Sequence, residues 1–289
     1  MPGLKKILIP IDFSPASEEA VDYGRRIASE FGARLTLLHV VRPLQFEFAM
    51  AQPTPGRYAD LVENRTQAVR EALERFAERQ WDGVQVQPEI REGDAAEEIV
   101  ARAHEDGFGL ILMPTRGTGP LRRWLFIGSV TAKVLAGAEC PVLTGLGFPR
   151  ESDGITVRRI VCAVDLGANS QRVLQWAQDV AQRYTAQLTV VHAAAAAGDA
   201  NQDYFDESWR STLITRLRQH ICDITRDVGI EGDILVEAGN APAIVAAAAS
   251  RLRADLVVIG RSTANGLLGR LRANAYDIIR RSPCPVISV

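Results

Sequence analysis

The chain contains two copies of one pattern, and this duplication limits its folds more than any other feature. An apolar run that ends at Asp12 returns as one that ends at Asp165, 153 positions later (165 − 12). Further along, Cys140 followed by proline returns as Cys284 followed by proline, 144 positions later (284 − 140). A shared order with drifting spacing indicates duplication of a whole globular domain, because this period is far too long for a solenoid unit.

The length and the composition of the chain agree with two globular domains. The chain has 289 residues, of which 47% are hydrophobic and 24% charged, enough for two separate cores. No apolar run is long enough to span a membrane and no signal peptide is evident, so we expect a cytoplasmic protein. The net charge of −2 argues against a dedicated nucleic-acid binder. The four cysteines show no metal-ligand spacing, so they are expected to be apolar filler in a reducing compartment, and no metal site is predicted.

Each half alternates short apolar runs with helical patterns. In the first half, strand Ile7–Ile11 is followed by Ser14-Pro15, which is typical of a helix start, and then by strand Leu35–Val41. Such alternation predicts an α/β fold with a doubly wound parallel sheet in each half, whose ligands lie beyond the carboxyl ends of the strands. Domain 1 is assigned to residues 1–146 and domain 2 to residues 157–289, with a Gly-rich and charged linker between them.

One connection in domain 1 is unusually long. The stretch Arg42–Tyr58 contains three prolines and is predicted to be an irregular loop that folds over something. A helix from about Asp60 to Arg79 and a strand over Val84–Ile90 should follow it. In domain 2, the last helix is expected near Arg272–Arg281.

The segment after the fourth strand of domain 1 is richest in signals of a binding site. Its glycines, from Gly117 to Gly128, allow phosphate oxygens to approach main-chain N–H groups. Gly128-Ser129 opens a helix whose first N–H groups suit an anion, and Arg116 adds positive charge. The spacing matches neither a Walker A motif nor the Rossmann fingerprint, and ordinary loop geometry is the alternative interpretation.

Asp12 and two histidines stand at notable positions in or after strands. Asp12 follows the first strand, and the sequence leaves two roles open: hydrogen bonding to a base or ribose, or capping of the loop that follows. His39 and His192 lie within apolar runs and are expected to be hydrogen-bonded core residues. No catalytic residue is predicted, because no nucleophile in a recognisable elbow accompanies them.

Four segments together resemble the universal stress protein family: Lys6–Ser14, Leu37–Val41, Gly128–Leu135 and Cys140–Leu143. The resemblance covers nearly the whole chain, as two copies in tandem. It implies a five-stranded, Rossmann-like parallel α/β fold in each half. It also implies an internal pseudo-dimer, in which Pro141–Thr144 would pair near Val286–Ser288.

The ATP-binding branch of this family carries the pattern G-x2-G-x9-G-[ST] after the fourth strand. In domain 1, Pro114 stands where the first glycine belongs, and ten residues instead of nine separate Gly117 from Gly128. The proline removes a backbone donor. For this half the resemblance implies ATP as the ligand, with Mg²⁺ only when ATP is bound. The implied contacts are Asp12 and the Val41 backbone near the adenine and ribose, Gly117, Gly128, Ser129 and Val130 at the phosphates, and Arg116 within reach of a phosphate.

Domain 2 departs further from the pattern. Gly260 is kept, but Thr263 replaces the second glycine. Ala273-Asn274 replaces the final Gly-Ser pair, or Arg272-Ala273 does if the alignment runs backward from Cys284. A Cβ atom at that site would crowd a phosphate against the helix terminus, so domain 2 is predicted not to bind nucleotide.

The leading hypothesis is a stress-response regulator or binding module that takes ATP in domain 1 and acts through an unidentified protein partner. A slow ATP hydrolase using the same pocket is one alternative, although no general base or metal-binding carboxylate pair stands beside Gly117 and Gly128. An interaction protein that binds no nucleotide is the other. Neither a membrane nor a nucleic acid is expected as a partner, and a homodimer of the whole chain is left open.

Overall fold

The structure is a computed structural model that describes residues 4–43, 55–78, 81, 83–115, 127–149, 155–194, 207–261 and 269–289. Strands and helices alternate in both halves, as predicted. Domain 1 contains β1 (Lys6–Pro10), α1 (Pro15–Phe31), β2 (Arg34–Val41), α3 (Pro55–Ala77), β3 (Val86–Glu92), α4 (Ala95–Glu105), β4 (Leu110–Pro114), α5 (Ser129–Gly137) and β5 (Val142–Gly145). Domain 2 contains β6 (Arg159–Ala163), α6 (Ser170–Tyr184), β7 (Gln187–Ala194), α7 (Glu207–Asp227), β8 (Asp233–Ala238), α8 (Ala241–Arg251), β9 (Leu256–Ile259), α9 (Gly269–Arg281) and β10 (Val286–Ser288).

The first helix shows how local chemistry sets the element boundaries. Ser14 is the N-cap of α1, and its hydroxyl oxygen accepts a hydrogen bond from the Ser17 backbone N–H at 3.2 Å. Pro15 occupies the first helical position, where its missing N–H costs nothing. Gly32 ends the helix in the left-handed conformation with φ +61°, which glycine adopts without strain.

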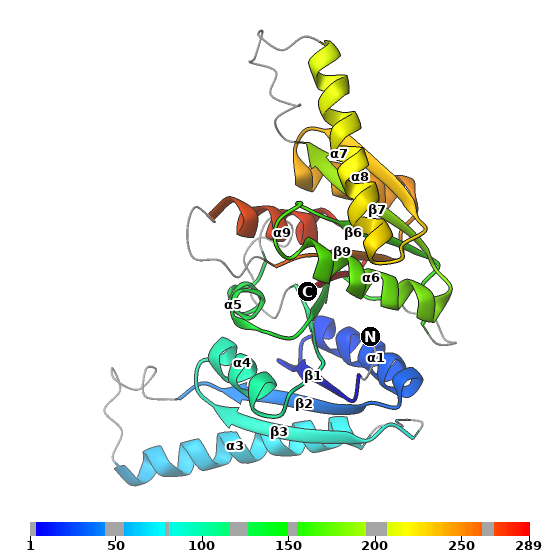
Figure 1. Cartoon of the computed structure of the whole chain (residues 1–289). Helices are drawn as coiled ribbons and strands as arrows, with labels where there is room; N and C mark the ends of the chain where they lie inside the picture. Colours follow the sequence, from blue (N-terminus) through cyan, green and yellow to red (C-terminus); the bar gives the residue numbers. More distant parts are fainter. Residues whose placement is uncertain are drawn as a thin grey trace.

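All described strands form one sheet of ten, in the order β3-β2-β1-β4-β5-β10-β9-β6-β7-β8. Neighbouring strands are parallel within each half, and the halves meet where β5 and β10 pair antiparallel. In that pair Thr144 lies opposite Val286, and Val142 lies opposite Ser288. The internal pseudo-dimer implied by the family resemblance is therefore confirmed. Figure 1 shows domain 1 in the lower part of the view and domain 2 in the upper part.

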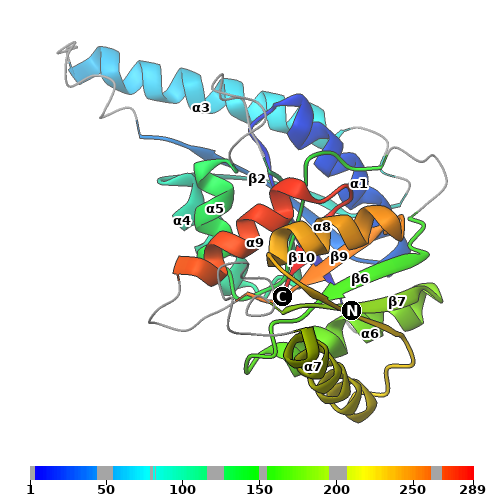
Figure 2. The same ribbon diagram turned by 90° about the horizontal axis from the view of Figure 1, so that it is seen from above.

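The core is shared between the halves. One cluster of buried side chains lies beneath α1, α3, α6 and α7 and contains both Ile9 and Cys162. The other lies beneath α4, α5, α8 and α9 and contains both Leu8 and Val161. Figure 2 shows α8 and α9 side by side on their face of the sheet. Because the sheet is continuous, the two expected cores merge into two layers that each cross the domain boundary.

Three boundaries differ from the sequence-based expectations. The strand expected over Val84–Ile90 is β3, which runs two residues later, from Val86 to Glu92. The segment expected to be irregular up to Tyr58 is already helical from Pro55, because proline is well suited to the first turn of a helix. Residues 44–54 of the same segment lie outside the described residues. The last helix begins at Gly269, earlier than the expected start near Arg272.

Side chains also join the halves away from the strand pair. The Arg183 guanidinium lies 4.0 Å from the centre of the Phe31 ring and donates a hydrogen bond to the Glu30 carbonyl at 3.0 Å. On the other face of the sheet, the Tyr276 hydroxyl donates to the Ala132 carbonyl at 2.9 Å. Among the described residues, no helix has both the length and the apolar character needed to cross a bilayer.

Candidate functional site

The strand order changes direction at β1 of domain 1, which has β2 on one side and β4 on the other. Ligands of doubly wound sheets bind beyond the carboxyl ends of the strands at such a switch point. Asp12 follows β1, Val41 ends β2, and Gly128 begins the helix that follows β4. The described residues that were predicted to form the site are therefore brought to one edge of the sheet.

Asp12 is exposed and caps the turn that leads into α1. Its Oδ1 atom accepts hydrogen bonds from the Ser14 backbone N–H at 3.0 Å and from the Ser14 hydroxyl at 2.5 Å. Phe13, which lies between Asp12 and Ser14 in the chain, has a left-handed backbone with φ 58°. The capping role that the sequence left open is thus confirmed, and Asp12 remains exposed at the carboxyl edge of the sheet.

Val41 is buried at the end of β2, with an exposed fraction of 8%. Its carbonyl oxygen accepts a hydrogen bond from the Gly93 backbone N–H at 3.0 Å, which anchors the start of the β3–α4 turn. A carbonyl oxygen has two lone pairs, so it can accept a second hydrogen bond from a ligand. The contact of Val41 with a ligand stays a prediction.

Among the described residues, no side chain caps the amino end of α5. Gly128 is the N-cap residue, with φ −58° and ψ 144°, and no side chain accepts a hydrogen bond there among the described residues. Its own N–H donates to the Thr115 carbonyl at 2.9 Å. Ser129 is exposed and Val130 half-buried in the first turn. The first N–H groups of a helix carry partial positive charge, so this end suits an anion.

Arg116 and Gly117, the other predicted phosphate contacts, lie outside the described residues, which resume at Ile127. Pro114, which stands where the family has its first glycine, is the last residue of β4 and lies opposite Gly145 of β5. The proline is thus accommodated at the end of the strand, and the Thr115 N–H after it still donates to the Gly145 carbonyl at 3.1 Å.

Two buried threonines that sequence analysis did not single out fix the position of α5. The Thr131 hydroxyl donates to the Pro114 carbonyl at 3.1 Å, and the Thr115 hydroxyl donates to the Gly145 carbonyl at 3.1 Å. Both side chains are at most 3% exposed. The Thr131 bond ties the first turn of α5 to the end of β4, and the Thr115 bond ties the residue after β4 to the end of β5. In the sequence the two residues are only a threonine directly after Pro114 and another three positions after Gly128, with no feature that marks their role.

A cation lies one turn further along α5. The Lys133 ammonium is 3.1 Å from a carboxylate oxygen of Asp94, the N-cap of α4. This hydrogen bond, together with those from the backbone N–H groups of Glu97 and Ala96, lowers the pKa of the Asp94 carboxyl. Within the ranges that the structure describes, no group of three or more His, Cys, Asp and Glu side chains could hold a metal ion.

The corresponding edge of domain 2 repeats the aspartate turn but not the helix start. Asp165 accepts from the Gly167 backbone N–H at 2.9 Å, and Leu166 has φ 61°, as Phe13 has in domain 1. The helix differs. Ser129 begins α5 eleven positions before Cys140 (140 − 129), whereas Gly269 begins α9 fifteen positions before Cys284 (284 − 269). In domain 2, the position that corresponds to the anion-binding start of α5 is therefore preceded by one further turn of α9. Ala273-Asn274, expected to replace the Gly-Ser pair, lies inside α9, and Thr263 falls outside the described residues.

Arg261 takes the position in domain 2 that Thr115 has in domain 1. Its backbone N–H donates to the Val289 carbonyl at 2.9 Å, just as the Thr115 N–H donates to Gly145. The side chain crosses into domain 1, where Nη2 donates to the Cys140 carbonyl at 2.5 Å. Nη1 is buried and has no hydrogen-bond partner in the described part of the chain. Burial lowers the pKa of this guanidinium to about 10.

We expect Arg261→Met to stabilise the protein by about 1 kcal/mol, because a buried cation without a carboxylate partner can be replaced by an apolar side chain of similar length. The lowered pKa means that the unfolded chain holds this proton more tightly, so the charge destabilises the fold at every pH below about 10. Urea unfolding at neutral pH measures the change. Arg218→Met on the exposed face of α7 is the control, with a change below about 0.5 kcal/mol. A lower stability for Arg261→Met would mean that the bond to Cys140 outweighs the burial of charge.

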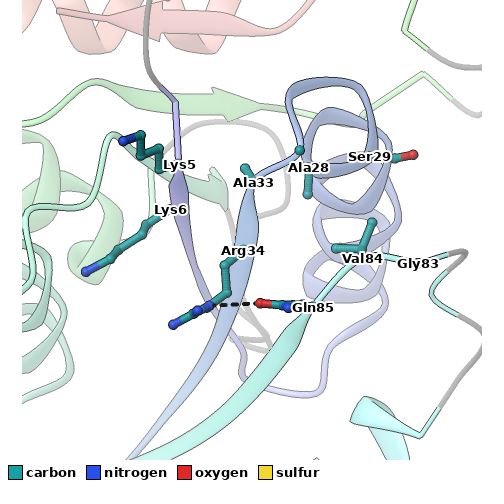
Figure 3. A pocket seen from close by; sticks show the side chains of 10 residues that line it. Lys5, Lys6, Ala28, Ser29, Ala33, Arg34, Gly83, Val84 and Gln85 are labelled. Atoms are coloured by element: carbon teal, nitrogen blue, oxygen red, sulfur yellow. Dashed lines mark hydrogen bonds between the residues drawn. The ribbon is translucent and has the colours of Figure 1, made fainter.

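A cleft of about 620 Å³ lies at the opposite, amino edge of β1, β2 and β3. Lys5, Lys6 and Arg34 line it together with the last turn of α1. Figure 3 shows these three cationic side chains projecting away from Ala28 and Ser29 on that helix. The Lys6 ammonium donates to the Asp106 carbonyl at 2.9 Å, and Arg34 donates to the Gln85 side chain at 3.4 Å. The polar groups do not converge on one point, so the carboxyl edge is the better candidate site.

Comparison with known proteins gives a consistent result. The model of the universal stress protein family matches residues 3–144 and again residues 156–289. Universal stress protein MJ0531 of Methanocaldococcus jannaschii is 36% identical over 139 residues, which cover 48% of this chain and 80% of that protein. A universal stress protein of Mycolicibacterium smegmatis is 26% identical over 222 residues, which cover 73% of this chain and 73% of that protein. The crystal structure of a universal stress protein from Archaeoglobus fulgidus aligns with 99% of this chain, and the alignment covers 97% of that protein. The TM-score is 0.68 and the identity is 19%, so this likeness supports the fold.

Proposed function

Because this chain belongs to the universal stress protein family, as two copies in tandem, we propose that it is a stress-response binding module that takes ATP in domain 1. The observation that carries the proposal is the meeting of Asp12, Val41 and the uncapped amino end of α5 at the switch point of the sheet. A nucleotide needs a polar partner for its ribose and a group of N–H donors for its phosphates. This edge offers both within one half of the molecule.

In this proposal, Asp12 and the Val41 backbone contact the ribose and adenine. Gly128, Ser129 and Val130 at the start of α5 hold the phosphates, with Gly117 and Arg116 of the preceding segment as further contacts. Gly128 allows a phosphate to approach the helix terminus without a side chain in between. Mg²⁺ enters only with the nucleotide. The signal is expected to pass from nucleotide occupancy to a protein partner.

Proteins of this family guide the choice of ligand. Solved structures that resemble half of this chain include a universal stress protein in complex with cAMP and one from Archaeoglobus fulgidus in complex with dAMP. They cover 47% and 46% of this chain with TM-scores of 0.36 and 0.35, so the argument for the site rests on this chain's own residues. Their ligands make adenine nucleotides the first probes to use.

Domain 2 is proposed to bind no nucleotide. Its aspartate turn is retained, but α9 begins one turn early and the Gly-Ser pair is missing. The expected stoichiometry is therefore one ATP per chain.

Calorimetric titration of the full chain with ATP and Mg²⁺ tests this proposal. We expect one site per chain, with Ser129→Ala weakening the affinity about fivefold, because one hydroxyl donor to a phosphate is lost. Asn274→Ala, the matched change in domain 2, should leave the affinity unchanged. The proposal would be wrong if the wild-type chain did not bind ATP, or if only the change in domain 2 weakened binding.

A further inference from the structure

A histidine holds the turn before each aspartate in place. In domain 1, Nδ1 of His39 lies 2.7 Å from the carbonyl oxygen of Ile11, the residue before Asp12. In domain 2, Nδ1 of His192 lies 2.8 Å from the carbonyl oxygen of Val164, the residue before Asp165. The predicted hydrogen bonds are confirmed for both histidines, but only His192 is buried in the core, whereas His39 is half-buried. Both bonds reach across 28 positions to the residue before the aspartate.

The hydrogen bond determines the tautomer of each ring. A carbonyl oxygen can only accept, so Nδ1 must carry the proton that it donates. The neutral imidazole then has its acceptor at Nε2. A ring held in this way is oriented by the backbone and keeps Nδ1 on the carbonyl oxygen.

In domain 1 this bond acts on the residues just beyond β1, which pairs with β2 as far as Pro10. The described pairing of β1 with β4 involves only Ile7 and Leu8. Pro10 has no N–H group to donate. Ile11 is then held through both of its backbone groups: its N–H donates to the Leu38 carbonyl at 2.8 Å, and its carbonyl accepts from His39.

The same ring also supports the strained residue that follows Asp12. The Phe13 ring lies over the His39 ring, with 4.9 Å between the ring centres. Phe13 has φ 58°, a conformation that is costly for an aromatic residue and persists only when its surroundings hold it. His39 thus fixes the residues on both sides of Asp12, one by a hydrogen bond and the other by ring contact.

We propose that His39 is a positioning residue for the nucleotide site of domain 1: it fixes the Ile11–Phe13 turn so that the Asp12 carboxylate faces the ligand. This inference rests on the proposed ATP site. A role limited to the hydrogen bond from Nδ1 would be the same for His39 and His192, because that bond is the same in both halves. A positioning role makes them differ, since α5 of domain 1 begins at the Gly-Ser pair opposite its aspartate, whereas α9 of domain 2 begins about one turn earlier and lacks that pair.

ATP titration of three variants distinguishes these roles. His39→Leu removes the donor and should weaken ATP binding about tenfold, because Asp12 is no longer held in position. His39→Asn places an amide N–H near the position of Nδ1 and should restore the affinity to within about threefold of wild type. His192→Leu should leave the affinity unchanged while lowering the urea midpoint about as much as His39→Leu does. Wild-type affinity in a folded His39→Leu protein would overturn the positioning role alone, whereas a wild-type chain that did not bind ATP would overturn the proposed function as well.

A second measurement needs no nucleotide. The ¹⁵N chemical shifts of the ring nitrogens of His39 should show a proton on Nδ1 at neutral pH, and the amide protons of Phe13 and Ser14 should exchange faster in His39→Leu than in wild type. A proton on Nε2 alone, or unchanged exchange at Phe13, would contradict the positioning role of His39 whether or not ATP binds.

Discussion

Gly128→Arg is expected to lower the affinity for ATP at least about 100-fold, which corresponds to about 3 kcal/mol. Gly128 is half-buried at the start of α5, and its dihedral angles of −58° and 144° are open to any residue, so the change should not strain the backbone. The new side chain would fill the space in front of the helix N–H groups, and its charge would oppose the positive end of the helix dipole. Calorimetric titration with ATP measures the loss, and circular dichroism checks that the protein stays folded.

Gly137→Arg is the matched control, because it adds the same side chain at the other end of the same helix. Gly137 is exposed, and a Cβ atom there would meet the Val100 side chain at 3.4 Å, an ordinary contact. A cation near the carboxyl end of a helix is favourable. This variant should bind ATP as wild type does. If Gly128→Arg also bound ATP normally while folded, the nucleotide would have to bind elsewhere.

Ile287→Asp is expected to abolish cooperative folding of the whole chain. Ile287 lies in the middle of β10 with no exposed surface, opposite Leu143 of β5 and Val258 of β9. A carboxylate at this point would be buried without a partner, which costs at least about 4 kcal/mol and approaches the total stability of a typical domain. Because both core layers cross the boundary between the halves, both should unfold together. Circular dichroism and size-exclusion chromatography measure the loss.

Ile287→Val serves as the control for this change. It keeps the strand apolar and removes one methylene group, so it should cost only about 1 kcal/mol. The flanking hydroxyls that cross the pair, from Thr144 to the Val286 carbonyl at 3.4 Å and from Ser288 to the Val142 carbonyl at 3.3 Å, would stay in place. An Ile287→Asp protein with a wild-type urea midpoint would show that the β5–β10 pair does not join the two halves.

Local signals in the sequence were sufficient for many elements. The helix predicted at Ser14-Pro15 begins as expected, because a hydroxyl cap and a proline act within one turn. The start of α9 could not be predicted in the same way. No side-chain cap or Gly-Ser pair marks it, and the alignment with domain 1 drifts by several residues in this region.

The candidate site was predictable in part. Asp12, Val41 and Gly128 were identified from their place after strands, because the carboxyl ends of parallel strands meet at one edge. Thr115 and Thr131 were not, since a threonine within an apolar segment can equally be a surface residue. Their role depends on which carbonyl groups lie beside them, and those belong to Pro114 and Gly145.

By itself the sequence determined the duplication, the alternation of strands and helices, and the residues placed at the ends of the strands. These features follow from apolar runs, caps and glycines, whose effects are confined to a few neighbouring residues. The pairing of β5 with β10 was implied by the family resemblance, and the tertiary structure gave its register. Only the tertiary structure decided that Arg261 enters domain 1 and that His39 is bonded to the turn at Asp12. Each of these contacts joins residues at least 28 positions apart, so it depends on how the chain packs and not on local conformational preference.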